Sequence, residues 1–196
     1  MKPSTLAELN PRSIVWSYGG GVQTIAILTL IAEGKLPRPD LAIMADTGRE
    51  RLSTWRYYKQ HAEPIFEELE IPFELAGHEL ATVDLYGHNG DLLLPVFTQT
   101  GKLPTYCSSE WKKIVVRRRL KELGYGPKNS IIMWMGMSLD EIDRMKTDDV
   151  KWIHNYYPLI EDYKLRRHEC LLQIERFGLP IPSKSACKLC PHLNNG

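Results

Sequence analysis

The feature that most constrains the fold is a glycine triplet between two apolar runs. Residues 14–17 are typical of a short buried strand, Gly19 to Gly21 of a tight turn, and residues 22–33 of a helix. Glycines let backbone N–H groups approach a ligand closely, and the first turn of a helix carries unpaired donors and a positive dipole end. The segment therefore predicts a phosphate cradle, with glycines that serve only tight packing as the alternative.

Strand and helix patterns alternate along the rest of the chain. Further strands are predicted at residues 41–45, 73–76, 130–135 and 155–160, and further helices at 53–69, 111–123 and 164–177. Residues 77–106 are expected to form a long insertion, because glycine and proline interrupt short apolar pieces there. This alternation predicts an α/β fold, a Rossmann-like parallel five-stranded sheet with helices on both faces.

Three loops are expected at the carboxyl ends of strands, where ligands bind in such sheets. They are the glycine turn, the loop Asp46-Thr47-Gly48 and the loop that begins at Gly136. In one shared site, Asp46 would accept a hydrogen bond from a ribose, an adenine or a metal-bound water, and Arg49 or Arg144 would contact phosphate. A turn-forming aspartate and solvated arginines are the alternatives.

Bulk composition limits the partners. The 196 residues are 43% hydrophobic and 25% charged, which is ordinary for a single globular domain. The net charge of +1 indicates no global basic field. The sequence shows no signal-peptide pattern and no apolar run long enough to span a bilayer, so we expect no membrane partner and a cytoplasmic location.

The four cysteines are more typical of ligands, nucleophiles or core residues than of disulfides in a reducing compartment. Cys187 and Cys190 have the C-x-x-C spacing of a chelating pair, and Cys107 and Cys170 would have to join them in the fold. A tetrahedral zinc site and a 4Fe-4S cluster both fit four cysteines, and His168 or His192 would replace one of them in a zinc site. The alternative is a redox-active C-x-x-C with Cys107 and Cys170 as buried apolar residues.

A local basic cluster lies at residues 112–119, on a predicted helix. Lys113 and Arg117 share a face at helical spacing, so this face would contact the phosphate of a nucleotide or a nucleic acid. A solvated basic face without a ligand is the alternative.

Several of these segments together resemble one family. In chain order they are residues 17–24, 45–50 with Thr54 and Tyr57, Cys107 with 111–114, 136–138 with Glu141 and Arg144, and 182–191. The set resembles the phosphoadenosine-phosphosulfate (PAPS) reductase-like branch of the PP-loop ATP pyrophosphatases, also called adenine nucleotide α-hydrolases. Relative to the PP-loop pattern S-x-S-G-G-K-D-S, the residues that match are Ser17, Gly20, Gly21 and the hydroxyl of Thr24, and those that depart are Gly19, Val22 and Gln23.

The resemblance implies binding of ATP or another adenine nucleotide, with Mg²⁺ possible, and cleavage at the α-phosphate in sulfur transfer. It assigns nucleotide binding to Ser17, Gly19, Gly20, Gly21, Gln23, Thr24, Asp46, Thr47, Gly136 and Arg144, and catalysis to Gln23, Thr24 and Lys113. It favours a 4Fe-4S cluster over zinc at Cys107, Cys170, Cys187 and Cys190. Partners would include a sulfur donor or redox protein, and a nucleic-acid substrate at the 112–119 helix.

The implied organisation is a single PAPS reductase-like domain over residues 1–196. It divides into an arm at 1–12, a nucleotide-binding core at 13–160, and a helix with the C-x-x-C segment at 161–196. One alternative function is a sulfonucleotide reductase, which the lack of a cysteine after Cys190 disfavours. The other is a non-catalytic nucleotide-binding subunit of nucleic-acid modification, because Val22 and Gln23 replace the family's charged pair.

Overall fold

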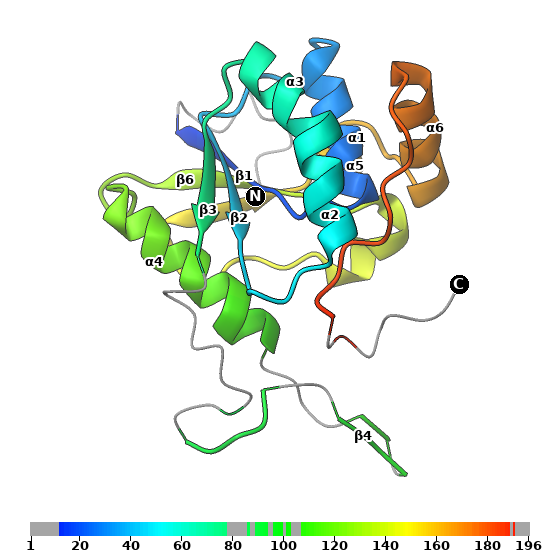
Figure 1. Cartoon of the computed structure of the whole chain (residues 1–196). Coiled ribbons are helices and arrows are strands. Elements are labelled where there is room, and N and C mark those ends of the chain that lie inside the picture. The colour runs from blue at the N-terminus through cyan, green and yellow to red at the C-terminus, as the bar shows by residue number, and fades with distance from the viewer. Residues whose placement is uncertain are drawn as a thin grey trace.

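The computed structural model describes residues 12–77, 86, 89–93, 96–99, 101–102, 107–188 and 190. Its centre is a five-stranded sheet whose neighbouring strands all run parallel (Figure 1). In spatial order the strands are β3 (Phe73–Ala76), β2 (Leu41–Ala45), β1 (Ser13–Ser17), β6 (Ile131–Met135) and β7 (Ile153–Tyr156). The predicted α/β fold with a parallel five-stranded sheet is confirmed.

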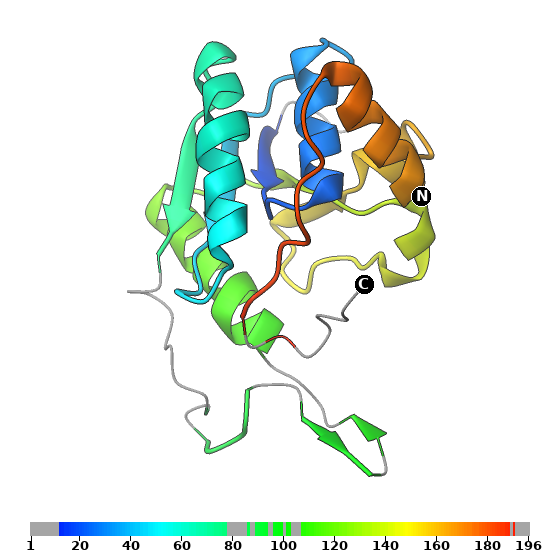
Figure 2. The same ribbon diagram turned by 45° about the vertical axis from the view of Figure 1, so that its right-hand side comes forward.

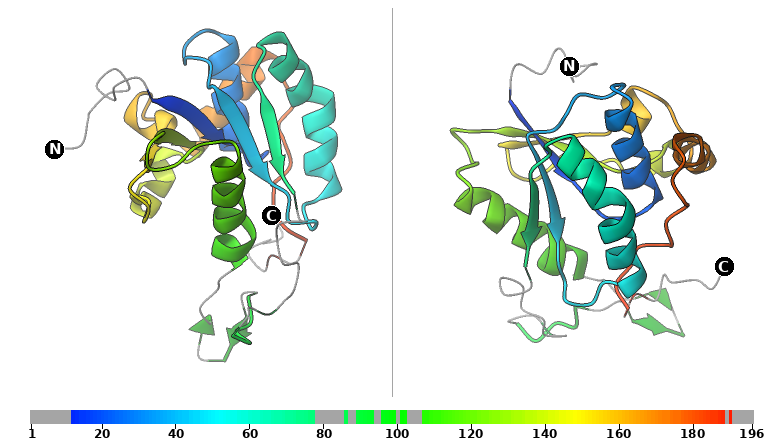
Figure 3. Two further views of the ribbon diagram at one scale, coloured as in Figure 1. Left: turned by 90° about the vertical axis from the view of Figure 1, so that its left-hand side faces the viewer. Right: turned by 45° about the horizontal axis from the view of Figure 1, so that its top comes forward.

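Helices cover both faces of this sheet (Figure 3). On one face lies α4 (Ile114–Glu122), which continues from the π-helical η3 (Ser109–Lys113). The other face is covered by α1 (Val22–Ala32), α2 (Leu52–Tyr57), η2 (Tyr58–Ala62), α3 (Glu63–Glu68) and α6 (Arg167–Phe177). No helix in the described ranges is both long and apolar enough to cross a membrane.

Alternation along the strands builds two cores. Successive side chains of a strand point to opposite faces, so Val15 packs in the cluster below α4 with Val115 and Leu120. Its neighbour Trp16 packs in the cluster on the other face of the sheet. There its ring stacks on the ring of Phe66, with the two ring centroids 5.6 Å apart. This division explains why β2 and β6 are apolar throughout, because both faces of a parallel sheet are covered.

Helix α1 is buried along almost its whole length, from Val22 to Ile31. It is apolar on all sides because it lies between the sheet and α6, which it contacts extensively (Figure 2). Its polar residue Thr29 is accommodated by two hydrogen bonds, one donated to the Ala26 carbonyl oxygen at 2.8 Å and one accepted from Gln173 at 3.3 Å. The layer of α1 and α6 is thus a packed structural unit.

Several predicted boundaries were wrong. The last strand begins earlier than predicted, at Ile153, and Pro158 instead starts the short helix α5 (Pro158–Glu161), where a proline at the first turn loses no helical hydrogen bond. The helix predicted at residues 53–69 is interrupted by the π-helical η2. After Gly136 the chain also forms the 3₁₀ segment η4 (Leu139–Arg144).

Within the predicted insertion at residues 77–106, the described part contains a short antiparallel hairpin apart from the main sheet (Figure 1). Its strands are β4 (Phe97–Thr98) and β5 (Gly101–Lys102). Most of the insertion and the predicted arm at 1–12, except Arg12, lie outside the described residues.

The strand order has a reversal next to β1. From β1 the chain moves through α1 to β2 on one side, whereas β6 pairs with β1 on the other side. In open α/β sheets such a switch point leaves a crevice at the carboxyl ends of the two strands, where ligands bind. The glycine turn follows β1 and the loop at residues 136–138 follows β6, so both predicted loops meet at this point.

Candidate functional site

Other segments approach two of the three glycines in the turn too closely for a side chain there. At Gly20, which has φ +66°, an added Cβ atom would lie 2.6 Å from Cγ2 of Thr54 in α2. At Gly21 an added Cβ would lie 2.8 Å from Oγ of Ser185. The tight packing considered for these glycines is therefore present at Gly20 and Gly21.

The amino terminus of α1 has unused hydrogen-bond donors. Gly21 is its N-cap and provides no side-chain cap, and its carbonyl oxygen accepts from the Ile25 N–H at 3.0 Å and from the Thr24 hydroxyl at 2.8 Å. Within the described ranges, the backbone N–H groups of Val22, Gln23 and Thr24 have no acceptor. Together with the helix dipole, these donors make the turn a site for an anion.

The loop after β6 closes the other side of the turn. A Cβ atom at Gly136 would lie 2.7 Å from Cγ2 of Thr24. The Gln23 side-chain amide donates to Glu141 Oε2 at 3.0 Å and to Ser138 Oγ at 3.4 Å. Arg144 forms an ion pair with the other oxygen of Glu141. Gln23 and Arg144, both predicted to bind the nucleotide, are thus linked through one carboxylate.

The loop after β2 and the end of β1 complete this edge. One carboxylate oxygen of Asp46 accepts the Gly48 N–H at 2.7 Å, and the hydroxyl of the buried Thr47 accepts the Arg49 N–H at 3.3 Å. Ser17, the last residue of β1, is in register with Ile43 of β2 and with Met135 of β6. Asp46 therefore stabilises its own turn, which is the alternative role given for it above. The loop that contains it lies at the carboxyl edge of the sheet, as predicted.

Residues 179–190, here called the C-terminal strap, run from α6 along α2 to the same edge (Figure 2). The Tyr57 hydroxyl donates to the Pro180 carbonyl oxygen at 2.7 Å. Further on, Cys187 forms an antiparallel bridge with Glu50, and the Lys188 N–H donates to the Arg49 carbonyl oxygen at 2.8 Å. The strap thereby reaches the loop after β2.

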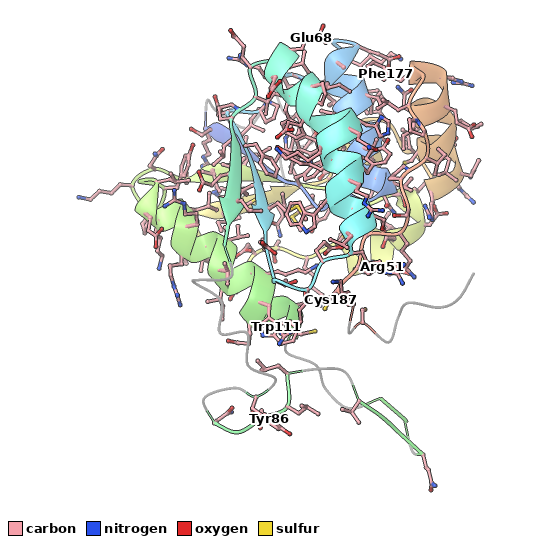
Figure 4. All side chains as sticks on the ribbon, in the orientation of Figure 1. Arg51, Glu68, Tyr86, Trp111, Phe177 and Cys187 are labelled. Atoms are coloured by element: carbon pink, nitrogen blue, oxygen red, sulfur yellow. The ribbon has the colours of Figure 1, made fainter. Side chains whose placement is uncertain are left out.

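Three of the four cysteines gather where the strap ends. Figure 4 shows Cys187 between Arg51 and Trp111, and Cys107 is in the first turn of the helix that contains Trp111. Burial raises the pKa of the Cys107 thiol, and the nearby thiols of Cys190 and Cys187 raise this pKa further. The Cys190 N–H donates to the Cys187 carbonyl oxygen at 2.9 Å, which forms a tight turn between the two.

Cys170 lies elsewhere. It is fully buried in α6, in the core that α6 shares with α1. Burial raises its pKa to about 12, with smaller contributions from Glu169 and Asp140. The structure therefore does not bring Cys170 to the other three cysteines. Among the described residues, no three His, Cys, Asp or Glu side chains are arranged closely enough to hold a metal ion.

Comparisons with known proteins agree with this architecture. No protein-family model matches the chain, and the search of curated proteins found no match. The U34-tRNA thiolase NcsA from Methanococcus maripaludis, solved with its [4Fe-4S] cluster, is similar in structure with a TM-score of 0.55 and 18% identity. A PAPS reductase from Candida auris, in a phosphate complex, has a TM-score of 0.55 and 14% identity. The chain has the PAPS reductase-like fold.

The similarity covers 91% of this chain but 60% of the thiolase, and 90% of this chain against 78% of the reductase. The chain thus spans less than two thirds of the thiolase. Both similar proteins are enzymes of the PAPS reductase-like fold. Residues 17–24, whose sequence resembles the PP-loop pattern, are called the PP-loop below.

The basic cluster of α4 is largely neutralised by acidic residues. Lys113 and Arg117 both form ion pairs with Asp149, and Arg117 also pairs with Asp148. Arg119 donates to Glu74 Oε1 at 2.7 Å and to Glu122 Oε2 at 3.0 Å. Lys113, which the resemblance assigned to catalysis, is therefore engaged by a carboxylate in this structure.

Thr54, Glu50 and Ser185 belong to the segments that resemble the family, but none of them was predicted to be a site residue. In the fold, Thr54 packs against Gly20 and Ser185 packs against Gly21. The buried Glu50 carboxylate accepts a hydrogen bond from the Thr54 hydroxyl at 3.2 Å. The sequence signal that could have indicated these residues is that they are polar and lie in short segments of the family resemblance.

Proposed function

We propose that this chain is an adenine-nucleotide-binding PP-loop enzyme that cleaves ATP, or a related nucleotide, at the α-phosphate during sulfur transfer. The observation that carries the proposal is the meeting of two elements at one edge of the sheet. The unused donors of the PP-loop lie there, and the strap that contacts Gly21 also carries the thiols of Cys187 and Cys190.

The PP-loop backbone would hold the phosphate. The N–H groups of Val22, Gln23 and Thr24 are fixed by the start of α1, so they need no reorganisation when negative charge develops on the phosphate oxygens. The Thr24 hydroxyl donates to Gly21 and keeps the turn in shape. Gln23, held by Glu141, orients the loop without adding charge. Because the PP-loop has no basic side chain, we expect the nucleotide to bind as its Mg²⁺ complex.

We propose that Cys107, Cys187 and Cys190 hold a 4Fe-4S cluster. For this they would have to lie closer together than in this structure, in which no three such side chains of the described residues could hold a metal ion. Thiolates are the ligands that such clusters prefer, and these three share one edge of the sheet, whereas Cys170 is in the core. The thiolase of similar fold carries a [4Fe-4S] cluster, which supports iron over zinc. A bound cluster would supply redox-active iron next to the nucleotide site.

The reaction is tested by the products of ATP turnover with Mg²⁺, separated by chromatography. AMP and pyrophosphate are expected, because cleavage at the α-phosphate gives these two products. Gly136→Ala should abolish turnover, since its Cβ would displace Thr24, whereas Gly126→Ala is the matched control because its added Cβ meets no atom within 4 Å. ADP as the product, or no turnover, would contradict the proposal.

A non-catalytic nucleotide-binding subunit is the second candidate. It is favoured by the uncharged PP-loop, in which Val22 and Gln23 replace the lysine and aspartate of the family pattern. Calorimetric binding of ATP without any turnover would support it. A role on nucleic acid would require binding at the 112–119 segment, where several basic side chains already form ion pairs, so weak binding with a shallow salt dependence is expected.

A further inference from the structure

We infer that Ser185 is a direct ligand of the phosphate bound at the PP-loop, so that the C-terminal strap supplies part of the nucleotide site. The inference rests on the proposed function of the PP-loop and adds a residue that lies far from it in the sequence. It is carried by the position of the Ser185 hydroxyl over Gly21 and by the lack of any other use for this hydroxyl.

The position is defined by the close approach at Gly21. Ser185 Oγ would be 2.8 Å from a Cβ atom at Gly21, whereas Ser185 Cβ would be 3.9 Å from it. The hydroxyl is therefore the part of Ser185 that points at the PP-loop. Gly21 is the N-cap of α1, so the hydroxyl lies beside the backbone donors of the first turn.

The hydroxyl has no competing partner. In the ranges that the structure describes, Ser185 makes no hydrogen bond, although it is half-buried. A hydroxyl both donates and accepts, so it can donate to a phosphate oxygen that the N–H groups of the first turn also contact. The hydroxyl would thus be a further hydrogen-bond donor to the phosphate, beside the backbone N–H groups, and it carries no positive charge. The PP-loop has no such charge of its own, because Val22 stands in the place of the lysine of the family pattern.

The strap is fixed on both sides of Ser185. Before it, the Pro180 carbonyl oxygen accepts the Tyr57 hydroxyl, and Pro182 is buried. After it, Cys187 bridges to Glu50. Because Ser185 lies between these anchors, its hydroxyl is held at the PP-loop at little entropic cost when the ligand binds. The same strap carries the thiols, so the two sites share one segment.

The test is calorimetric binding of inorganic pyrophosphate, ATP and adenosine to the full chain and to two serine variants. Ser185→Ala should weaken pyrophosphate and ATP binding about tenfold or more, the usual effect of losing a hydrogen bond to a charged group. Adenosine affinity should not change, because it has no phosphate. Ser183→Ala, an exposed serine of the same strap, is the matched control and should bind all three ligands like the wild type.

A second variant separates ligand contact from strap docking. Gly21 has φ −95°, so Gly21→Ala introduces no backbone strain and acts mainly by pushing away the Ser185 hydroxyl. In Gly21→Ala/Ser185→Ala this clash is relieved, because the next atom, Ser185 Cβ, is 3.9 Å away. The double variant should therefore bind pyrophosphate no more weakly than Ser185→Ala alone.

Two results would overturn the inference, and they differ from each other. If the wild type binds pyrophosphate and ATP but Ser185→Ala binds them equally well, Ser185 is not a ligand and the proposed function stands. A wild type that binds neither pyrophosphate nor ATP would remove the proposed function together with this inference. Equal weakening of adenosine and pyrophosphate in Ser185→Ala would show a structural role for Ser185 and likewise overturn the assignment.

Discussion

The carboxyl edge of the sheet and the layer formed by α1 and α6 contain the same residue types in different environments, a meeting point of loops and a packed core. The edge has Gly20, Gln23 and Cys187, and the layer with its connecting turn has Gly34, Gln173 and Cys170. In the layer, polar groups are satisfied within the packing, as for Gln173, which donates to Thr29 at 3.3 Å and to Glu33 at 2.8 Å. At the edge, Gln23 instead links two separate loops.

This difference teaches that residue type alone does not assign function. A cysteine, a glutamine or a glycine has a structural role where neighbouring side chains of one packed layer surround it and satisfy its polar atoms. It is available for a ligand where several loops meet and backbone donors stay unused. The following predictions compare matched residues of the two regions.

The largest difference is expected for iron binding. In protein purified without oxygen, Cys187→Ala should lose essentially all iron, acid-labile sulfide and brown colour, because Cys187 would be a ligand. Cys170→Ala should keep them, since Cys170 is buried in the layer. Metal and sulfide analysis with visible absorption measures this. Iron loss in a folded Cys170→Ala, or zinc in place of iron in the wild type, would contradict the proposed three-cysteine cluster.

Thiol reactivity should also separate the two regions. In metal-free native protein at pH 8, iodoacetamide should modify the half-exposed Cys187 at least about 100-fold faster than Cys170, because the thiolate is the reactive form and burial raises the pKa of Cys170 to about 12. Mass spectrometry of the peptides gives the rates. Comparable rates for the two cysteines in folded protein would show that α6 does not bury Cys170 in solution.

The same pKa shift predicts how stability depends on pH. Because the pKa of Cys170 is higher in the folded state than the ordinary thiol value of about 8.5, its contribution is fully present below that value and is lost as the pH rises towards 12. The free energy of unfolding from urea titrations should therefore fall less steeply above pH 9 in Cys170→Ala than in the wild type. Equal slopes would argue against a buried neutral thiol.

Alanine substitutions at the two positive-φ glycines that flank α1 should differ in their effect on stability. Gly20→Ala should cost about 2 to 4 kcal/mol, because strain at φ +66° is joined by a contact of 2.6 Å with Thr54. Gly34→Ala has a similar φ of +68° but open space around it, so it should cost about 1 kcal/mol. Urea unfolding of both variants measures the difference. Equal costs would mean that α2 does not pack on the PP-loop.

The smallest effect is expected for the two glutamines. Gln173→Ala should lower the free energy of unfolding by about 1 to 2 kcal/mol and leave ATP affinity unchanged, because it leaves the buried Thr29 and the carboxylate of Glu33 without their donor. Gln23→Ala should change stability by less than about 1 kcal/mol but weaken ATP binding or turnover. The reverse pattern would place the functional site away from the PP-loop.

Much of the fold and part of the candidate site could be predicted from local sequence. The apolar run of β1, the glycine turn and the long apolar α1 are contiguous signals, and the parallel sheet followed from the alternation of such units. Boundaries next to turns were less predictable, as the early start of β7 shows, because the polar residues His154 and Asn155 interrupt the apolar pattern of this strand.

By itself, the sequence determined the α/β fold, the position of the PP-loop and the presence of four cysteines, because each depends on neighbouring residues. Only the tertiary structure decided that Cys170 belongs to the core, that Asp149 neutralises Lys113, and that Ser185 lies over Gly21. These relations join segments far apart in the chain, and they depend on how helices pack on the sheet, which no local pattern specifies.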